Sequence, residues 1–536
     1  MKCDLIVCRN LSVPLSSESG EAHDAAAVEK ATKKYRSAFG KTPDGCGFIY
    51  KKSVDARKRD AMKFIYSVAF DAATIRTDRL PEGFEAVSLA EPDFTPDEAV
   101  KHKRVIVVGM GPCGLFAALA LANAGLCPTV LERGQDIGSR VKTVDTYWHN
   151  GTLDEESNVQ FGEGGAGMFS DGKLLTRISD PLSSYVLHTF AKFGAPEEIV
   201  YLAKPHIGTD RLRGIVERMR AEIIRLGGSI RFGAKVTDVL KSSDGRVCGV
   251  CVNGEETIAC DALFLCIGHS ARDTFVSLHG SGITLAPKDF SVGVRVEHLQ
   301  KDIDEALYGR FAGFDALGHA SYTLAAKEGG RACYSFCMCP GGTVVASASA
   351  KGEIVTNGMS IYARDGANAN AAIAVSVGAN EAGSGLFAGM EFQRALEQTA
   401  FEMAHGAAPV MLLGDLLAGE GRHEPKRVMP TYTGRTELCN LTELFPDFII
   451  QSMRSGFARF DKQIRGFCVH DAVLTAPETR TSSPIRIPRN ALFVSDSCPN
   501  LYPLGEGAGY AGGITSAAVD GLRGALAFLH PERKDV

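Results

Sequence analysis

Three glycines at fixed spacing follow a short apolar run. Gly109, Gly111 and Gly114 come directly after residues 105–108. Glycines at this spacing permit a tight turn, a close approach of the backbone to a pyrophosphate, and close packing of a helix on a strand. Glu132 ends a second apolar run, at a position where a carboxylate accepts hydrogen bonds from a ribose diol. The pattern predicts a strand, a turn, a helix and a second strand that together bind a dinucleotide.

The C-terminal part carries a second pattern, which distinguishes between dinucleotides. Residues 491–496 are predicted to form a strand that ends at Asp496, and residues 504–513 to open a helix over 512–529. Reduced flavin is anionic at N1/O2, and the N-terminus of a helix stabilises that charge. Flavin enzymes of the glutathione-reductase type show both features. No second glycine fingerprint occurs between residues 275 and 465, so a separate NAD(P)H domain is not expected.

The predicted cofactor is FAD, bound without a covalent link. Either the substrate itself reduces or reoxidises the flavin, or NAD(P)H docks transiently as an electron donor. Arg140 lies where this fold often reaches back to the pyrophosphate, and the Val236 backbone lies on the adenine side. No metal ligand is predicted, and no catalytic residue is assigned. The predicted cofactor-binding residues are Gly109, Gly111, Pro112, Cys113, Gly114, Glu132, Arg133, Arg140, Gly164, Gly165, Val236, Gly268, Asp496, Glu506, Gly507, Ala508 and Gly509.

Four stretches resemble the signature of a family of FAD-dependent dehydrogenases, also called NAD(FAD)-utilising dehydrogenases. They are residues 161–174, 267–274, 334–342 and 481–486. The resemblance covers most of the chain, including residues 53–57. It implies bound FAD, and it does not imply a substrate. More distantly, the chain is similar to the flavoprotein group that contains aromatic hydroxylases and geranylgeranyl reductases.

Several polar residues are candidates for contact with flavin or substrate. Asp171 and Lys173 belong to a glycine-rich loop that is expected near the flavin. His269 is either a proton donor that works near neutral pH or a residue that caps the end of a strand. Arg364 either lines the substrate pocket or lies on a surface loop. Arg480 and Arg486 are candidates for holding an anionic substrate group.

Composition narrows the class of protein. The chain has 536 residues, a net charge of -5 and 45% hydrophobic residues, so we expect no nucleic-acid partner. No signal peptide or apolar run of membrane-spanning length is found, which favours the cytoplasm. The chain has 15 cysteines. Cys333, Cys337 and Cys339 could supply three thiolates to a metal, but no matching fourth ligand is nearby.

The sequence predicts an α/β protein with a glutathione-reductase-type, Rossmann-like FAD domain built from two segments. Residues 101–284 form the first segment and residues 466–536 the second. Residues 285–465 are expected to be an inserted α+β substrate domain. Residues 1–100 form a small N-terminal α/β module, which docks a protein partner, caps the active site or only stabilises the fold. The oligomeric state is left open.

The predicted function is that of an FAD-dependent oxidoreductase. A hydride would pass between flavin N5 and an unidentified small organic substrate, with the redox chemistry supplied by the cofactor. A flavin-dependent monooxygenase is the first alternative. An RNA-modifying flavoprotein is a second, which the acidic net charge disfavours. A flavin-binding assembly or sensor protein is a third.

Overall fold

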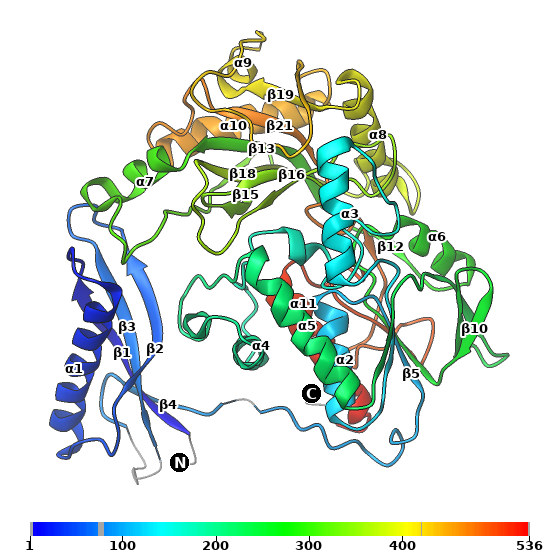
Figure 1. Ribbon diagram of the computed structural model, residues 1–536, viewed down its shortest axis with the longest axis horizontal. Coiled ribbons are helices and arrows are strands. Elements are labelled where there is room, and N and C mark those ends of the chain that lie inside the picture. The colour runs from blue at the N-terminus through cyan, green and yellow to red at the C-terminus, as the bar shows by residue number, and fades with distance from the viewer. Residues whose placement is uncertain (1–3, 73–79, 90, 420, 534–536) are drawn as a thin grey trace.

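The computed structural model describes residues 4–72, 80–89, 91–419 and 421–533. Its three largest sheets have four, five and seven strands. Figure 1 shows the four-stranded sheet to one side of the molecule and the seven-stranded sheet above the elements of the nucleotide fold. Within the described ranges, no helix is both long and apolar enough to cross a bilayer.

The N-terminal unit is an antiparallel sheet of order β2-β3-β1-β4 with one helix on its face. Tyr35 from that helix is buried, and its ring packs against those of Phe70 and Phe84 from the sheet. Phe311 joins the same apolar core from a distant segment, so the unit packs against the rest of the chain through that segment. The elements are β1 (Leu5–Pro14), α1 (Gly20–Phe39), β2 (Phe48–Asp55), β3 (Lys63–Asp71) and β4 (Phe84–Val87).

The nucleotide fold is a parallel sheet of order β23-β11-β5-β6-β7. Its strands are β5 (Val105–Val108), β6 (Thr129–Leu131), β7 (Ser229–Arg231), β11 (Ala262–Leu265) and β23 (Leu501–Pro503). Its helices are α2 (Pro112–Asn123), α3 (Ile137–Asn150), η1 (Ala166–Phe169), α4 (Leu182–Lys192), η2 (Glu197–Val200), α5 (Thr209–Arg225), α6 (Arg272–Gly280) and α11 (Ile514–Leu529). A three-stranded antiparallel sheet is formed by β8 (Val236–Lys241), β9 (Val247–Val252) and β10 (Glu256–Ala259).

Strand β5 is apolar throughout because both faces of the parallel sheet are covered. Val105 and Val107 belong to the core shared with α2, α5 and α11. Ile106 and Val108 face the opposite core, which the β8–β10 sheet closes. Successive side chains of a strand point to opposite faces, so a strand covered on both sides has no polar position to alternate with.

The last strand of the parallel sheet lies further along the chain than predicted. The expected strand over 491–496 is wrong: this segment forms turns, and the strand is β23. The side chain of Asn490 accepts hydrogen bonds from the N–H groups of Leu492 (2.9 Å) and Val494 (3.1 Å). This local turn offers the backbone an alternative to a sheet ladder. The helix predicted over 512–529 is confirmed as α11.

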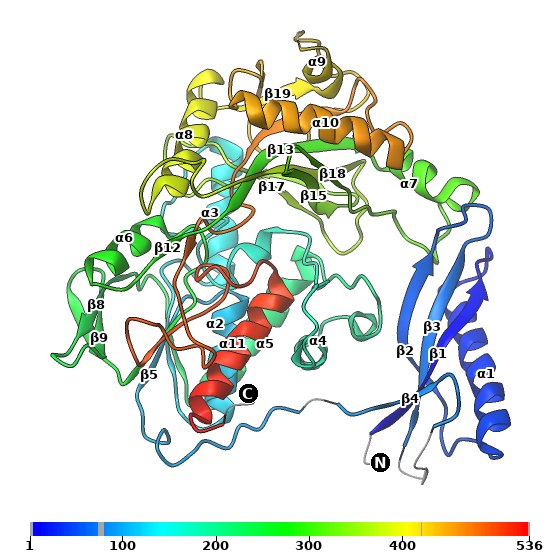
Figure 2. The same ribbon diagram turned by 180° about the vertical axis from the view of Figure 1, so that it is seen from behind.

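The second large sheet has the order β14-β15-β18-β13-β21-β19-β20. It extends to β21, beyond the predicted boundary at residue 465. Figure 2 shows α10 on its outer side, away from the nucleotide fold. Two small antiparallel sheets, β12–β22 and β16–β17, accompany the seven-stranded sheet. The elements of this part of the chain are β12 (Ala286–Pro287), β13 (Phe290–Leu299), α7 (Gln300–Tyr308), η3 (Gly309–Phe311), β14 (Ala325–Glu328), β15 (Arg331–Cys339), β16 (Thr343–Ala346), β17 (Thr356–Met359), β18 (Asn368–Val377), α8 (Ala388–Met403), β19 (Ala408–Leu412), α9 (Leu413–Ala418), β20 (Thr436–Leu438), α10 (Asp447–Gln463), β21 (Val473–Glu478) and β22 (Ile485–Arg486).

Candidate functional site

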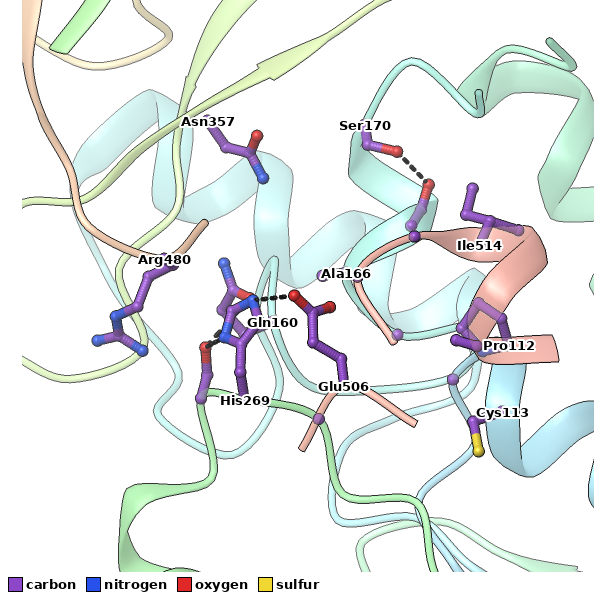
Figure 3. Close-up of a pocket in the computed structure, with 18 of the residues that line it drawn as sticks. Pro112, Cys113, Gln160, Ala166, Ser170, His269, Asn357, Arg480, Glu506 and Ile514 are labelled. Carbon is purple, nitrogen blue, oxygen red and sulfur yellow. Dashed lines mark hydrogen bonds and ion pairs between the residues drawn. The ribbon is translucent and has the colours of Figure 1, made fainter. Parts of the chain in front are cut away.

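A cavity of about 400 Å³ joins the nucleotide fold to the seven-stranded sheet. Residues 108–113 and 266–271, which follow β5 and β11, line it from the parallel sheet. Residues 335–338 of β15 line it from the seven-stranded sheet, and Asn357 lines it from β17 of the two-stranded β16–β17 sheet. Figure 3 shows Asn357 across the cavity from Glu506 and Pro112. The volume falls within the range of about 300–1,000 Å³ that is typical of small-ligand sites.

The glycine turn presents bare backbone to this cavity. Gly109 has φ +93°, a conformation that L side chains rarely adopt, and a Cβ there would lie 2.4 Å from the Cys266 carbonyl oxygen. A Cβ on Gly165 would lie 2.9 Å from Gly111 Cα, so two glycine loops touch backbone to backbone. Helix α2 begins directly after Gly111, with no side chain capping its first N–H groups. The turn thus leaves room and donors for a phosphate group.

Glu132 is almost fully buried, and its carboxylate connects separate segments. One oxygen accepts the N–H of Met110 (2.8 Å) from the glycine turn. The other accepts the N–H groups of Gly134 (2.9 Å) and Gly162 (3.0 Å). A carboxylate has about four acceptor positions, so capacity for a ligand hydroxyl remains.

Arg140 lies elsewhere than predicted. Its guanidinium donates to the carbonyl oxygens of Asn158 (2.8 Å), Val159 (3.0 Å), Glu163 (2.6 Å) and Gly165 (3.0 Å). The side chain is fully buried and does not line the cavity. These carbonyl oxygens accept the guanidinium N–H groups that were expected to bind a pyrophosphate. Arg140 therefore shapes the loop that borders the site.

The structure separates the predicted cofactor-binding residues into two sets. Those that line the cavity are Gly109, Gly111, Pro112, Cys113, Glu132, Arg133, Gly165, Val236, Gly268 and Glu506. Those that do not are Gly114, Arg140, Gly164, Asp496, Gly507, Ala508 and Gly509. Close packing explains several of the second set: a Cβ would lie 1.9 Å from the Gly109 oxygen at Gly114, and 2.5 Å from the Gly268 oxygen at Gly507.

Asp496 is exposed in a turn, so the prediction that it is the acid at the end of the last parallel strand is wrong. Because β23 ends at Pro503, the acid that follows the last parallel strand is Glu506. Figure 3 shows Glu506 between His269 and the start of α11, which Ile514 marks. Helix α11 has Gly513 as its N-cap and carries neither a capping side chain nor an acidic residue in its first turn.

Glu506 and His269 are both uncharged near neutral pH. Burial raises the pKa of Glu506 to about 8, although Lys288 opposes the rise. Burial, together with Arg480 and Arg272, lowers the pKa of His269 to about 3. The His269 Nε2 atom lies 3.9 Å from a Glu506 oxygen, and its Nδ1 atom lies 2.9 Å from the Ser270 hydroxyl. His269 therefore does not act as a cationic acid here, whereas Glu506 retains a proton.

Arg480 lines the cavity but is not available to an anionic substrate. Its guanidinium donates to both oxygens of Glu397 (2.7 and 3.0 Å) and approaches Glu353 (3.3 Å). Arg272 pairs with the same Glu397 at 2.8 Å. The interpretation of Arg480 as an anion-binding residue is wrong, because these buried carboxylates already neutralise its charge.

Other cationic side chains line the cavity and have fewer acidic partners than Arg480. They are Lys173, Arg177, Lys204 and Arg364. Asp171 is buried and pairs with Arg364, and its carboxylate lies 3.8 Å from the Lys173 Nζ atom. An isolated β-bridge pairs Lys173 with His206, and this pairing brings the nearby Lys204 to the site. The sequence carries no motif for this contact. The excess of positive charge favours an anionic group in this cavity.

Comparisons with known proteins identify the family. Residues 289–481 match the model described as "FAD-dependent protein, C-terminal domain-like", and residues 107–170 match an NAD(P)-binding Rossmann-like domain. A protein of Clostridium beijerinckii named "Uncharacterized protein" is 45% identical over 485 residues, which cover 89% of this chain and 90% of that one. The chain belongs to a family of FAD-dependent oxidoreductases. The glycine turn, the start of α2 and Glu132 fit its FAD cofactor.

Solved structures show weaker likeness. A geranylgeranyl bacteriochlorophyll reductase-like protein from Thermoplasma acidophilum is 12% identical, with a TM-score of 0.35 and coverage of 81% of this chain and 79% of that one. A glycerol-3-phosphate dehydrogenase from Bacillus halodurans, complexed with FAD, is 11% identical, with a TM-score of 0.32 and coverage of 81% and 65%.

Replacing Glu506 by Gln should flatten the pH dependence of stability. The folded protein holds a proton on Glu506 up to a pKa of about 8, whereas the unfolded chain releases it near the ordinary value of 4.5. The unfolded state thus binds fewer protons between these values, so this residue lowers stability as pH rises through the window. Thermal unfolding of flavin-free protein at several pH values tests this. Glu255→Gln, at an exposed turn, is the control, and equal slopes for wild type and Glu506→Gln would contradict the expectation.

Proposed function

We propose that the protein transfers a hydride between flavin N5 and a small organic substrate in this cavity. The observation that carries the proposal is the continuity of the cavity. It runs from the glycine turn to the polar residues of the seven-stranded sheet, so one space serves both cofactor and substrate. The excess of cationic side chains supports an anionic substrate.

The residues that would hold FAD follow from the lining of the cavity. Gly109, Gly111 and the start of α2 would bind the pyrophosphate, and Glu132 the adenosine ribose. The start of α11, with Gly513 as its N-cap, would face the flavin ring. When bound, FAD supplies the two-electron chemistry. We further propose that the link is non-covalent, that the fold is of the glutathione-reductase type, and that the chain is one of the NAD(FAD)-utilising dehydrogenases.

The chain itself would orient the substrate and manage one proton. Lys173 and Arg364 would bind an anionic group of the substrate. Glu506 is partly shielded from water, which raises the pKa of its carboxyl group to about 8, so this group holds a proton at neutral pH where it lines the cavity. It is thus a candidate proton donor within the site.

The overall organisation completes the proposal. We propose residues 101–284 and 466–536 as the FAD-binding segments and residues 285–465 as the core of the substrate domain. We propose residues 1–100 as a separate module, which docks a protein partner, caps the active site or only stabilises the fold. We also propose a cytoplasmic location for the protein.

Replacing Glu132 by Ala should release FAD. The substitution removes the acceptor proposed for the ribose and also leaves the N–H groups of Met110, Gly134 and Gly162 without their partner. The measurement is the amount of flavin per chain after purification, by absorption and by release on denaturation. Glu255→Ala is the matched control. Full flavin occupancy in Glu132→Ala would contradict the assignment.

Anaerobic reduction tests the electron donor. Of the two electron routes, we propose transient docking of NAD(P)H, so adding NADH or NADPH without oxygen should bleach the flavin absorption. Flavin that stays oxidised with both nucleotides would overturn that part of the proposal and direct the search to metabolite donors. Substrate-stimulated oxygen uptake with oxygen incorporation would replace the dehydrogenase by a monooxygenase.

A further inference from the structure

Strand β15 changes its geometry where it borders the cavity. Four consecutive residues, 335–338, line the cavity, although side chains of a regular strand alternate between two faces. The register with β18 shifts between Phe336 and Cys339. Cys337 has φ +43°, a left-handed conformation that non-glycine residues adopt rarely. Such conformations are held by their surroundings and concentrate at functional sites.

A buried arginine holds this irregular segment. Arg295 Nη1 donates to the Cys337 carbonyl oxygen at 3.0 Å and lies 4.0 Å from the Cys339 sulfur. Its charge is balanced by Glu478, with contacts of 2.9 and 3.0 Å. Gly358 leaves the space for it, because a Cβ there would lie 2.0 Å from Arg295 Nη1. The position of Cys337 is therefore set by a dedicated set of contacts.

The two cysteines of this segment differ in their protonation. The Cys339 thiol donates to the Cys337 carbonyl oxygen at 3.3 Å. The interaction with this neighbouring side chain, together with the charges of Lys173 and Arg295, lowers the pKa of Cys337, against burial and Asp171. The same contact with Cys337 raises the pKa of Cys339 well above its usual value. At neutral pH this makes Cys337 a thiolate and Cys339 a neutral thiol. The thiolate is the nucleophilic form of cysteine.

The other cysteines near this region have different surroundings. Cys113 and Cys266 line the cavity on the nucleotide side, and burial raises the pKa of Cys113 well above its usual value. Cys333 lies against α10, where a Cβ on Gly456 would fall 2.4 Å from its sulfur. Cys333 therefore lies apart from Cys337 and Cys339, so the three thiols considered as metal ligands do not converge on one point. Cys337 and Cys339 form a separate pair.

We propose that Cys337 and Cys339 form a redox-active dithiol that reduces low-molecular-weight anionic disulfides. Cys337 reaches the cavity, and Lys173 and Arg364 beside it carry the charge that would attract carboxylates. The Cys339 sulfur lies 3.3 Å from the Cys337 carbonyl oxygen, so the two cysteines are in direct contact. The proposal goes beyond hydride transfer and requires no bound flavin.

The exchange takes place in two steps. The Cys337 thiolate attacks one sulfur of R–S–S–R, a bond forms between Cys337 Sγ and that sulfur, and R–S⁻ leaves. The Cys339 sulfur then bonds to Cys337 Sγ, its proton passes to the second R–S⁻, and the mixed disulfide breaks. The dithiol loses two electrons and the small disulfide gains them.

The test uses the purified full-length protein and two small disulfides of opposite charge. Dithiobisnitrobenzoate is anionic and releases a coloured thiolate, whereas cystamine is cationic. The anionic probe should react in a fast phase that releases two thiolates per chain, and mass spectrometry should find a Cys337–Cys339 disulfide. Cys339→Ser should stop at a mixed disulfide on Cys337 with one thiolate released. Cys337→Ser should lose the fast phase, and Cys46→Ser, at an exposed position, should retain it.

The pH profile separates this thiolate from ordinary thiols. Because the pKa of Cys337 is lowered, the fast phase should persist at pH 6, whereas an ordinary thiol of pKa about 8.5 keeps less than about 1% of its plateau rate there. The proposal is overturned if wild-type protein gives no Cys337–Cys339 disulfide, if the fast phase survives in Cys337→Ser, or if cystamine reacts as fast as the anionic probe. These readouts do not depend on flavin, so a failure here leaves the proposed hydride transfer to be judged separately.

Discussion

The buried carboxylate of Glu132 is the interaction on which the nucleotide site depends. It accepts N–H groups from the glycine turn, from the segment after β6 and from the loop at Gly162. Each of these donors would otherwise be buried without a partner, which is unfavourable by about 1–3 kcal/mol per group. One side chain thus fixes the relative position of the backbone segments that border the cavity. The same carboxylate keeps an acceptor position for a ligand, so stability and binding rest on one residue.

The same design recurs on both sides of the cavity. Arg140 collects carbonyl oxygens of the loop 158–165, and Arg295 holds the irregular segment of β15 against Glu478. Arg480 and Arg272 share Glu397. Buried charges of this kind are weak sources of stability by themselves, yet removing one partner leaves an uncompensated charge. Here the buried charged groups fix the positions of loops and strand ends, which are not held by the hydrogen bonds of regular secondary structure.

The parts of the site that could be predicted are those determined by neighbours in sequence. The run from Val105 to Glu132 contains its own strand, turn, helix and acid, so residue spacing alone indicates its geometry. Asp496 was predicted from an apolar run that resembles a strand, but the local turn at Asn490 prevails. Arg140 lies at the expected spacing, whereas the direction of its side chain depends on a loop folded around it. Cys337 reaches the cavity through a bulge that depends on pairing with β18, and no local pattern encodes that.

The central claim is that one cavity holds FAD next to the seven-stranded sheet. The direct measurement is the visible absorption spectrum of the purified protein, followed by identification of the cofactor released on denaturation. We predict flavin absorption, with about one FAD per chain that separates from the polypeptide without a covalent link. A colourless protein that cannot be reconstituted with FAD would contradict the account.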